Sequence, residues 1–218
     1  YNHSLGLTTI VYTNISQLDK SMTRFLHDND VSMVIKIDSM QKDTYNLMMD
    51  GDHYDDFQKG LENIKEIYGD QSYLNSSKGI SRIQVSTVLT KLNVDELEDI
   101  HSFSHDNGYI FCCKTPGRKG SSDKNWDYLI GDEESYLQRQ AFRYTDKEQT
   151  TANIEGKCSI STYGIAITRT GEAALCESVR DIRIGNVRDY PLRHLALRRQ
   201  EIFQDYGCPG CIAKHLYN

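Results

Sequence analysis

Four of the six cysteines have spacings that suit a shared metal centre. The segment Cys208-Pro209-Gly210-Cys211 places two thiols around a Pro-Gly turn, and two thiolates at this spacing can hold one metal. Cys158 and Cys176 lie at the two ends of a predicted β-hairpin, which returns its ends to each other. Four converging thiolates are the ligand set of a [4Fe–4S] cluster or of a structural zinc ion. Unrelated free thiols are the third interpretation.

A hairpin and a helix are the elements that must position these cysteines. Two strand-like runs, 160–170 and 173–176, flank a turn in which Gly171 lets the chain reverse sharply. Pro191 suits the first turn of a helix that runs to about Tyr206. This helix leads directly to the terminal cysteine pair, so we expect hairpin and helix together to bring the four thiols to one point.

The first 115 residues alternate between strand-like and helix-like patterns. Four runs rich in β-formers are separated by segments with apolar residues at helical spacing: 7–12, 31–37, 83–89 and 109–113. This alternation predicts an α/β fold with parallel strands, either a doubly wound sheet or part of a barrel. In both architectures the ligand lies at the carboxyl ends of the strands. After a polar loop at 116–125, we expect a helix around residues 133–144.

The composition excludes several classes of function. The net charge is -6 and no stretch is dominated by Lys and Arg, which argues against a nucleic-acid partner. No apolar run approaches the roughly 20 residues of a membrane helix, and no signal peptide is visible. Clustered cysteines without a secretory mark favour a cytoplasmic protein with metal ligands rather than disulfides.

The cysteine pattern resembles the twitch/SPASM module of radical SAM enzymes. Gly171 stands between Cys158 and Cys176, the stretch 184–187 follows, and the terminal pair comes last. The full SPASM form has further cysteines after that pair and binds two auxiliary clusters. No cysteine follows Cys211 here, so the single-cluster twitch form fits better. The resemblance implies one auxiliary [4Fe–4S] cluster on the four cysteines.

The first half resembles the partial (β/α)6 barrel of the same superfamily. Residues 12–14 are similar to the end of the barrel's third strand, 35–39 to the fourth strand and its loop, and 85–90 to the fifth. The resemblance implies that side chains at these strand ends contact S-adenosylmethionine (SAM), namely Asn14, Lys36, Asp38, Ser39 and Thr87. Many relatives have a serine where this chain has Lys36, two residues before the aspartate.

One motif of the family is absent from the sequence. The catalytic cluster needs three cysteines in a C-x-x-x-C-x-x-C loop after the first strand, and the six cysteines contain no such spacing. The chain also opens on Tyr1, without an initiator Met. We therefore expect an N-terminal part with the catalytic loop to be missing, and this chain by itself not to cleave SAM.

The predicted organisation is a partial barrel over residues 1–145 and an auxiliary-cluster domain over 146–218. The resemblance implies the C-terminal portion of an oxidoreductase that modifies a peptide or small molecule by radical chemistry, with substrates such as ribosomal peptides, aminoglycoside precursors or sulfatase proteins. A flavodoxin or ferredoxin is the expected electron donor. The rival hypothesis is a non-catalytic, zinc-stabilised α/β module that binds a protein partner.

Several candidate residues have a structural interpretation beside the functional one. Asp38 and Ser39 suit a turn and helix cap as well as SAM contact, and Asn14 suits a cap better. Cys112-Cys113 in a strand predicts one core and one barrel-lining side chain. His101 and His105 have the i, i+4 spacing of metal ligands, but solvent exposure is the favoured interpretation. A capping box is expected from Asn93 to Glu96.

Overall fold

The computed structural model describes residues 8–69, 81–118, 120–146, 165–176 and 179–206 of the 218-residue chain. The chain divides into two compact units, residues 1–149 and 150–218, here called unit 1 and unit 2. Among the described residues, no helix combines the length and the apolar character that a membrane crossing requires.

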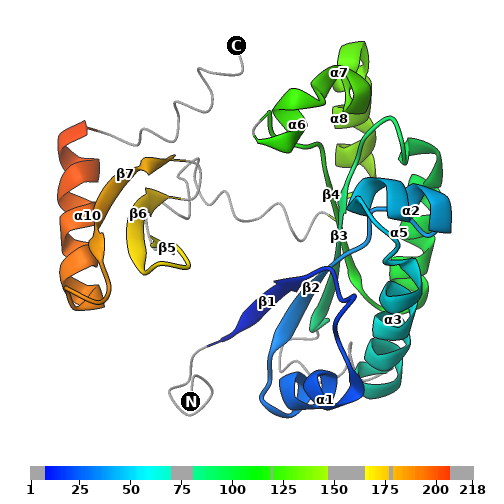
Figure 1. The fold of residues 1–218 in the computed structure, drawn as a ribbon, viewed down its shortest axis with the longest axis horizontal. Coiled ribbons are helices and arrows are strands. Elements are labelled where there is room, and N and C mark those ends of the chain that lie inside the picture. The colour runs from blue at the N-terminus through cyan, green and yellow to red at the C-terminus, as the bar shows by residue number, and fades with distance from the viewer. Residues whose placement is uncertain (1–7, 70–80, 119, 147–164, 177–178, 207–218) are drawn as a thin grey trace. The chain divides into compact units, whose positions relative to one another are not determined.

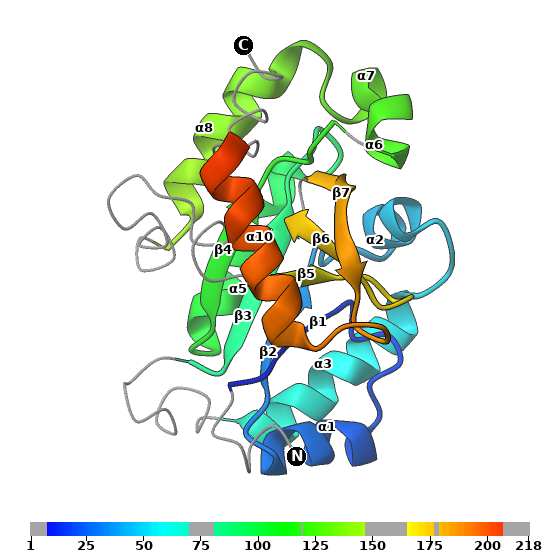
Figure 2. The ribbon, with the colours of Figure 1, turned by 90° about the vertical axis from the view of Figure 1, so that its left-hand side faces the viewer.

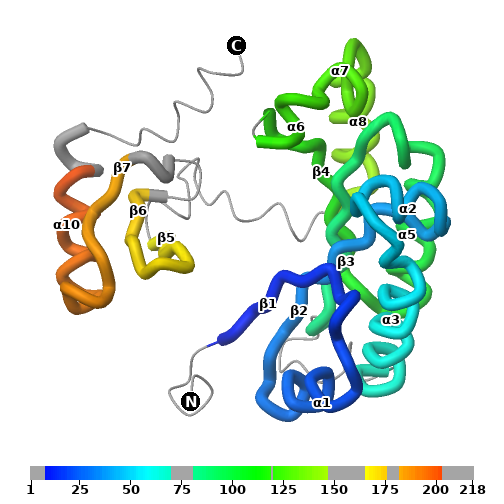
Figure 3. The backbone as a smooth tube through the Cα atoms, in the orientation of Figure 1, coloured from blue at the N-terminus to red at the C-terminus, as the bar shows by residue number. Residues whose placement is uncertain are grey.

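Unit 1 is built on a four-stranded parallel sheet in the order of the sequence (Figure 1). The strands are β1 (Ile10–Thr13), β2 (Ser32–Lys36), β3 (Ile83–Val88) and β4 (Ile110–Lys114). Parallel neighbours need a crossover between them, and helices provide it, as the tube in Figure 3 follows from β1 through the first helix to β2. The α/β class is confirmed, although four strands do not show a barrel.

The longer helices of unit 1 are α1 (Lys20–Asp28), α2 (Lys42–Met49), α3 (Tyr54–Tyr68), α5 (Leu97–Asp106) and α8 (Glu134–Tyr144). The short helical pieces among the described residues of the unit are η2 (Val94–Glu96), α6 (Ser121–Lys124), α7 (Trp126–Leu129) and η3 (Gly131–Glu133). Helices α1, α3 and α5 lie on the same side of the sheet in Figure 1. Helix α8 packs beside β4.

The core of unit 1 lies between the sheet and this helical layer. Alternate residues of β3 point to opposite faces, so that Ile83 and Val85 are fully buried while Gln84 and Ser86, which follow them, are half-buried. Ile83 and Val85 join a continuous apolar cluster with residues of β2, β4, α1, α2, α3, α5, α7 and α8. The opposite face, here called the open face, carries Ser32 and Lys36 of β2, Gln84 and Ser86 of β3 and Lys114 of β4.

The two edges of the sheet differ. Past the end of α8 the chain runs along β4: the Asp146 amide donates to the Phe111 carbonyl at 3.0 Å, and a carboxylate oxygen of Asp146 accepts from the Phe111 amide at 2.7 Å. The Thr145 hydroxyl bonds both main-chain groups of Cys113 at 2.9 Å. This edge of β4 is therefore covered. Among the described strands, β1 pairs only with β2.

The described residues of unit 2 form a three-stranded antiparallel sheet and one helix. Its elements are β5 (Ala166–Ile167), β6 (Glu172–Cys176), β7 (Val179–Asn186) and α10 (Leu192–Tyr206). The antiparallel pairing of β5 with β6 confirms the turn end of the predicted hairpin, and Gly171 in its turn has a φ of +85°. Residues 160–164 of its predicted first strand lie outside the described residues. The predicted helix after Pro191 is also confirmed. Figure 1 shows α10 lying along β7.

Residues 184–187 allow α10 to pack closely against the sheet of unit 2. A Cβ on Gly185 would lie 2.7 Å from the Leu195 side chain, so glycine permits the helix to approach this closely. Asn186 donates to the Thr170 carbonyl at 3.2 Å and accepts from the Arg188 amide at 3.0 Å. Asn186 therefore joins the hairpin turn to the turn before α10.

Two local predictions were wrong. The capping box does not form, because the Asn93 and Glu96 side chains bond to partners on other elements instead of to each other's main chain. The segment 116–125 is not a continuous loop, since it contains α6. The helix α2, between the fourth-strand-like segment and α3, was not anticipated.

Candidate functional site

The carboxyl ends of β2 and β3 are joined by two buried polar side chains. Asp38 follows β2 and its carboxylate accepts a hydrogen bond from the Val88 amide at 2.8 Å. The Asn93 amide nitrogen donates to the Asp38 carbonyl at 2.6 Å and to the Val88 carbonyl at 3.0 Å, while its oxygen accepts from the Thr90 amide at 2.8 Å. Buried polar groups need such partners, so this network fixes where the two strands end.

A buried glutamate holds the loop that follows β2. One carboxylate oxygen of Glu96 accepts from the Ser39 hydroxyl at 2.6 Å, from the Met40 amide at 2.9 Å and from the Gln41 amide at 3.3 Å. Glu96 comes from η2, more than 50 residues further along the chain, so a distant element sets the shape of residues 39–41. Sequence reasoning missed this role because it assigned Glu96 to a local cap.

Lys36 and Asp38 form an ion pair at the end of β2. The Lys36 ammonium lies 2.7 Å from a carboxylate oxygen of Asp38, whose side chain is almost fully buried. Burial raises the pKa of Asp38, and the nearby Lys36 charge opposes that rise. The Lys36 side chain is 44% exposed, so its ammonium can also meet a ligand from the open face.

Strand register places Lys36 in a polar row across the open face. Lys36 is opposite Ser86 on β3, and Ser86 is opposite Cys112 on β4. Cys112 is buried, and burial raises the pKa of its thiol, which keeps it protonated at neutral pH. The row can therefore offer one cation, one hydroxyl and one neutral thiol to a ligand. The predicted division of Cys112 and Cys113 between two faces agrees with the apolar cluster, which includes Cys113.

The remaining predicted SAM contacts lie in different surroundings. Thr87 is fully buried, shares the strand face of Val85, and donates to the Ile37 carbonyl at 2.7 Å. Asn14 is exposed beyond the end of β1, where its oxygen accepts from the Ser16 hydroxyl at 3.2 Å. The structure thus brings Lys36, Asp38 and Ser39 together at one strand end, with Thr87 directed to the core and Asn14 to solvent.

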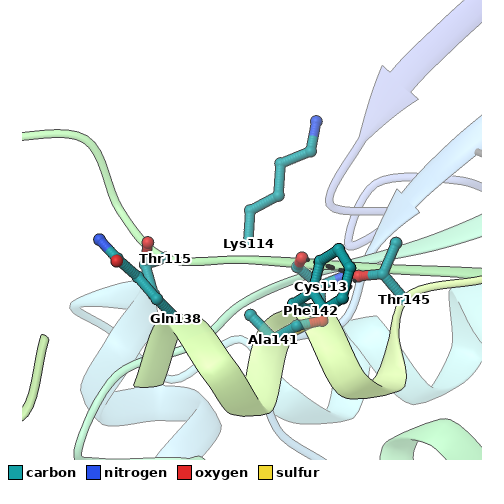
Figure 4. Close-up of a pocket in the computed structure, with 7 residues that line it drawn as sticks. All are labelled: Cys113, Lys114, Thr115, Gln138, Ala141, Phe142 and Thr145. Carbon is teal, nitrogen blue, oxygen red and sulfur yellow. Dashed lines mark hydrogen bonds between the residues drawn. The ribbon is translucent and has the colours of Figure 1, made fainter. Parts of the chain in front are cut away.

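A cavity of 290 Å³ lies at the carboxyl end of β4, between this strand and α8. Figure 4 shows Cys113 and Thr145 at one end of it and Gln138 beside Thr115 at the other, while the Lys114 side chain points away from α8. None of the five predicted SAM contacts lines this cavity. Its lining offers the hydroxyls of Thr115 and Thr145, the amide of Gln138, the thiol of Cys113 and the ammonium of Lys114.

Of the four predicted cluster ligands, only Cys176 falls within the described residues. Cys158, Cys208 and Cys211 lie outside them. Cys176 is the last residue of β6 and is opposite Val179, the first residue of β7. The hairpin register pairs Ala166 with Ala174, so Cys176 is two residues past that pair and Cys158 eight residues before it. Straight strand pairing alone therefore does not set these two cysteines opposite each other.

The direction of α10 can be read from its contacts with the sheet of unit 2. Leu195 packs on Gly185, which is opposite Ala173 near the start of β6. One turn later, the buried Arg199 donates to the Leu175 carbonyl at 3.1 Å, next to the end of β6. Helix α10 consequently runs in the direction of β6, and both finish at the same end of unit 2 in Figure 1.

Comparison with solved structures found chains of similar fold. Two are structures of anSMEcpe with bound AdoMet, an anaerobic sulfatase-maturating radical SAM enzyme; both have a TM-score of 0.57 and 15% identity, and the match covers 90% of this chain and 56% or 58% of theirs. Another, anSMEcpe with bound AdoMet and Kp18Cys peptide, has a TM-score of 0.53, 14% identity, and coverage of 90% and 59%.

At this identity the likeness shows the fold alone, and the chain spans 56–59% of the length of these neighbours. No protein-family model matches the sequence, and no curated protein matches it. The resemblance to radical SAM enzymes inferred from motifs is thus supported at the level of fold, across most of the described chain.

Proposed function

We propose that this chain is the C-terminal part of a radical SAM enzyme. In this proposal, residues 1–145 form a wall of the barrel that holds SAM and a peptide substrate. Residues 146–218 bind one auxiliary [4Fe–4S] cluster through Cys158, Cys176, Cys208 and Cys211. The likeness in fold to a radical SAM enzyme supports the assignment, and it extends over 90% of the chain.

The main support for the cluster is the course of α10. Because α10 and β6 end at the same side of unit 2, the chain leaves the helix there, two residues before Cys208. Cys176 is at that end of β6. Two of the proposed ligands thus start from one region, which fits a four-thiolate centre.

The side chains at the end of β2 have distinct proposed roles toward SAM. Lys36, half-exposed in the polar row, contacts the carboxylate of the SAM amino acid part. Asp38, Ser39 and Glu96 act as positioning residues, since their hydrogen bonds hold the loop at 38–41. Asn14, exposed beyond β1, is proposed as a further contact, and Thr87 positions the strand end through Ile37.

The auxiliary cluster, when bound by four thiolates, supplies one-electron transfer. Four protein ligands leave no open iron site, so the proposed role is acceptance of an electron from the substrate radical rather than direct ligation of substrate. A peptide substrate is favoured because some structures of the similar fold contain peptides. A flavodoxin or ferredoxin is the proposed electron donor.

Metal analysis of the full chain after anaerobic purification tests the cluster. We expect broad absorbance in the visible range, with about four irons and four sulfides per chain. Cys176→Ser and Cys208→Ser should lower the iron content strongly, whereas the control Cys112→Ser should leave it unchanged. A colourless protein with about one zinc per chain would instead support the zinc-stabilised binding module and overturn the cluster.

The coding sequence upstream of the Tyr1 codon tests the family assignment separately. A C-x-x-x-C-x-x-C loop in the same reading frame is expected under the proposal. If that frame contains no such loop, the chain is not part of a SAM-cleaving enzyme, whatever metal unit 2 binds.

A further inference from the structure

A second group of metal-ligating side chains lies in unit 1, away from the four cysteines in the sequence. His101 and His105 are one turn apart on α5, and Asp146 follows α8. One nitrogen of each imidazole and one carboxylate oxygen all lie within 4.8 Å of one another. We propose that these three residues bind a divalent transition-metal ion such as Zn²⁺, independently of the proposed function.

The distances fit an ion after a small side-chain adjustment. Nε2 of His105 and Oδ1 of Asp146 are 3.1 Å apart. With metal–ligand bonds of about 2.0–2.1 Å, two ligands of a tetrahedral site are separated by roughly 3.3 Å. The His105–Asp146 pair has nearly this separation, and His101 lies within 4.8 Å of both, so small side-chain movements complete three ligands.

Asp146 is held in place for this role by the edge of β4. Its Oδ2 accepts from the Phe111 amide at 2.7 Å, and its own amide donates to the Phe111 carbonyl at 3.0 Å. Oδ1 is the oxygen directed at His105. Hydrogen bonds to the second oxygen of a ligating carboxylate orient it toward the metal, and this is the pattern seen here.

The imidazole of His101 is restrained by neighbouring rings. It meets Phe111 and Tyr144 edge-on, with ring centroids 5.3 Å and 5.2 Å away, and lies 4.2 Å from the His105 ring. An imidazole restrained in this way loses little freedom when an ion arrives.

The partial exposure of His105 and Asp146 gives an ion a path from solvent to the site. The His105 side chain is 47% exposed and Asp146 is 20% exposed, so an ion can reach the group from solvent. Three ligands from protein leave at least one coordination position for water, as in open zinc sites. The bound ion would connect α5 to the segment that covers the edge of β4.

The test measures zinc binding to the full, anaerobically purified chain by calorimetry with ZnCl₂. We expect about one Zn²⁺ per chain that is lost in the His105 and Asp146 variants, whether or not unit 2 binds a metal of its own. His105→Gln, an exposed position, and Asp146→Asn should each weaken this binding by roughly tenfold or more, at least the effect of losing an outer-shell partner. The exposed control His53→Gln should bind as the unsubstituted chain does.

Two further readouts separate this site from the cysteines. Cobalt(II) at the proposed site should give weak visible bands without thiolate charge-transfer absorption, and these bands should vanish in His105→Gln. Zn²⁺ at about 100 times its Kd should slow hydrogen exchange of the α5 amides about 100-fold where exchange requires this unit to open. Absence of additional Zn²⁺ binding, or equal affinity in His105→Gln, would overturn the site without bearing on the cluster.

Discussion

The two units of the molecule are stabilised in different ways. In unit 1 the apolar cluster draws on three strands and on most of the helices, and it contains large, fully buried side chains such as Phe57 and Phe111. In unit 2, within the described residues, the cluster consists of Ala173, Ile184 and Leu195, with partly buried residues around it. The described elements around this cluster are three short strands and α10, which can be followed in Figure 2.

This difference indicates what each unit depends on. A small apolar core supplies little net stability, so small folds commonly add a metal or other cross-link. Unit 2 adds the buried Arg199–Leu175 hydrogen bond, the close Gly185–Leu195 contact and, in our proposal, four thiolates on one cluster. Unit 1 has the core of an ordinary domain. A substitution in either unit should therefore change mainly the stability of that unit, because each unit has its own core.

The largest effect is expected from Phe111→Ala. Phe111 is the second residue of β4 and is fully buried, and truncation of a buried phenylalanine costs about 3–5 kcal/mol. Denaturant unfolding monitored by segment-resolved hydrogen exchange should show loss of protection in β2, β3 and β4 but not in β6 and β7. Phe142→Ala, at a side chain that is 79% exposed, is the control and should change stability by at most about 0.5 kcal/mol. Equal loss in both units would contradict the independence of the two cores.

Gly185→Ala should produce the converse pattern. The added Cβ would lie 2.7 Å from Leu195 at a φ of +142°, so overpacking and backbone strain add. We expect a loss of about 2–4 kcal/mol confined to unit 2. Ile167→Ala, at an exposed position of β5, serves as the matched control. Unchanged exchange in α10 and β7 of the Gly185 variant would show that the contact does not hold the helix.

Glu96→Ala tests whether unit 1 also depends on polar contacts. The change leaves the Ser39 hydroxyl and the Met40 and Gln41 amides without their carboxylate acceptor. We expect a loss of about 1–3 kcal/mol and faster exchange of the two amides. Glu98→Ala, an exposed neighbour on α5, should leave those amides protected. Full protection in the Glu96 variant would mean that the loop shape is set by other contacts.

The smallest effect concerns pH. Burial raises the pKa of Asp38 above its usual 3.8, so the folded chain holds this proton more tightly than the unfolded chain. Stability therefore falls as the pH rises from below 3.8 through the folded-state pKa. The substitution Asp38→Asn removes this loss of stability. As the pH rises through that range, the free energy of unfolding of the variant should therefore increase relative to that of the unsubstituted chain.

Asp19→Asn should change the pH dependence in the opposite direction. The Met22 amide, which donates to the Asp19 carboxylate at 2.8 Å, holds the pKa of that group below its usual range. The ionised Asp19 carboxylate therefore stabilises the folded chain above pH 3.8, and this stabilisation is lost as the pH falls through the folded-state pKa. Urea unfolding at a series of pH values compares the two variants. The same sign for both would contradict the assigned causes.

Sequence patterns predicted the elements whose stabilising partners are near in the chain. Helix α3 has an apolar face at helical spacing, the β5–β6 hairpin has Gly171 in its turn, and α10 begins just after Pro191. The β-rich run 83–89 also predicted β3, which the structure has at Ile83–Val88. In each case periodicity or a turn residue carries the information, so no knowledge of distant contacts was needed.

The side-chain roles that sequence patterns did not predict depend on partners that are remote in sequence. Asn93 and Glu96 have the spacing of a local cap, but Asp38, Met40 and their neighbours compete successfully for their side chains. His105 is exposed as expected, whereas His101 is half-buried, because Phe111 and Tyr144 cover it from other elements. The group they form with Asp146 was missed because 41 residues separate that aspartate from His105.

Because the chain after α8 covers the edge of β4, the sheet of unit 1 can be extended at one edge and not at the other. Thr145 and Asp146 occupy the main-chain groups of Cys113 and Phe111 that an added strand would need. Ile10–Thr13, at the opposite border, has β2 as its one hydrogen-bonded neighbour among the described strands. Any polypeptide that enlarges this sheet, whether from the same chain or from another, therefore has to attach beside β1 and grow away from it.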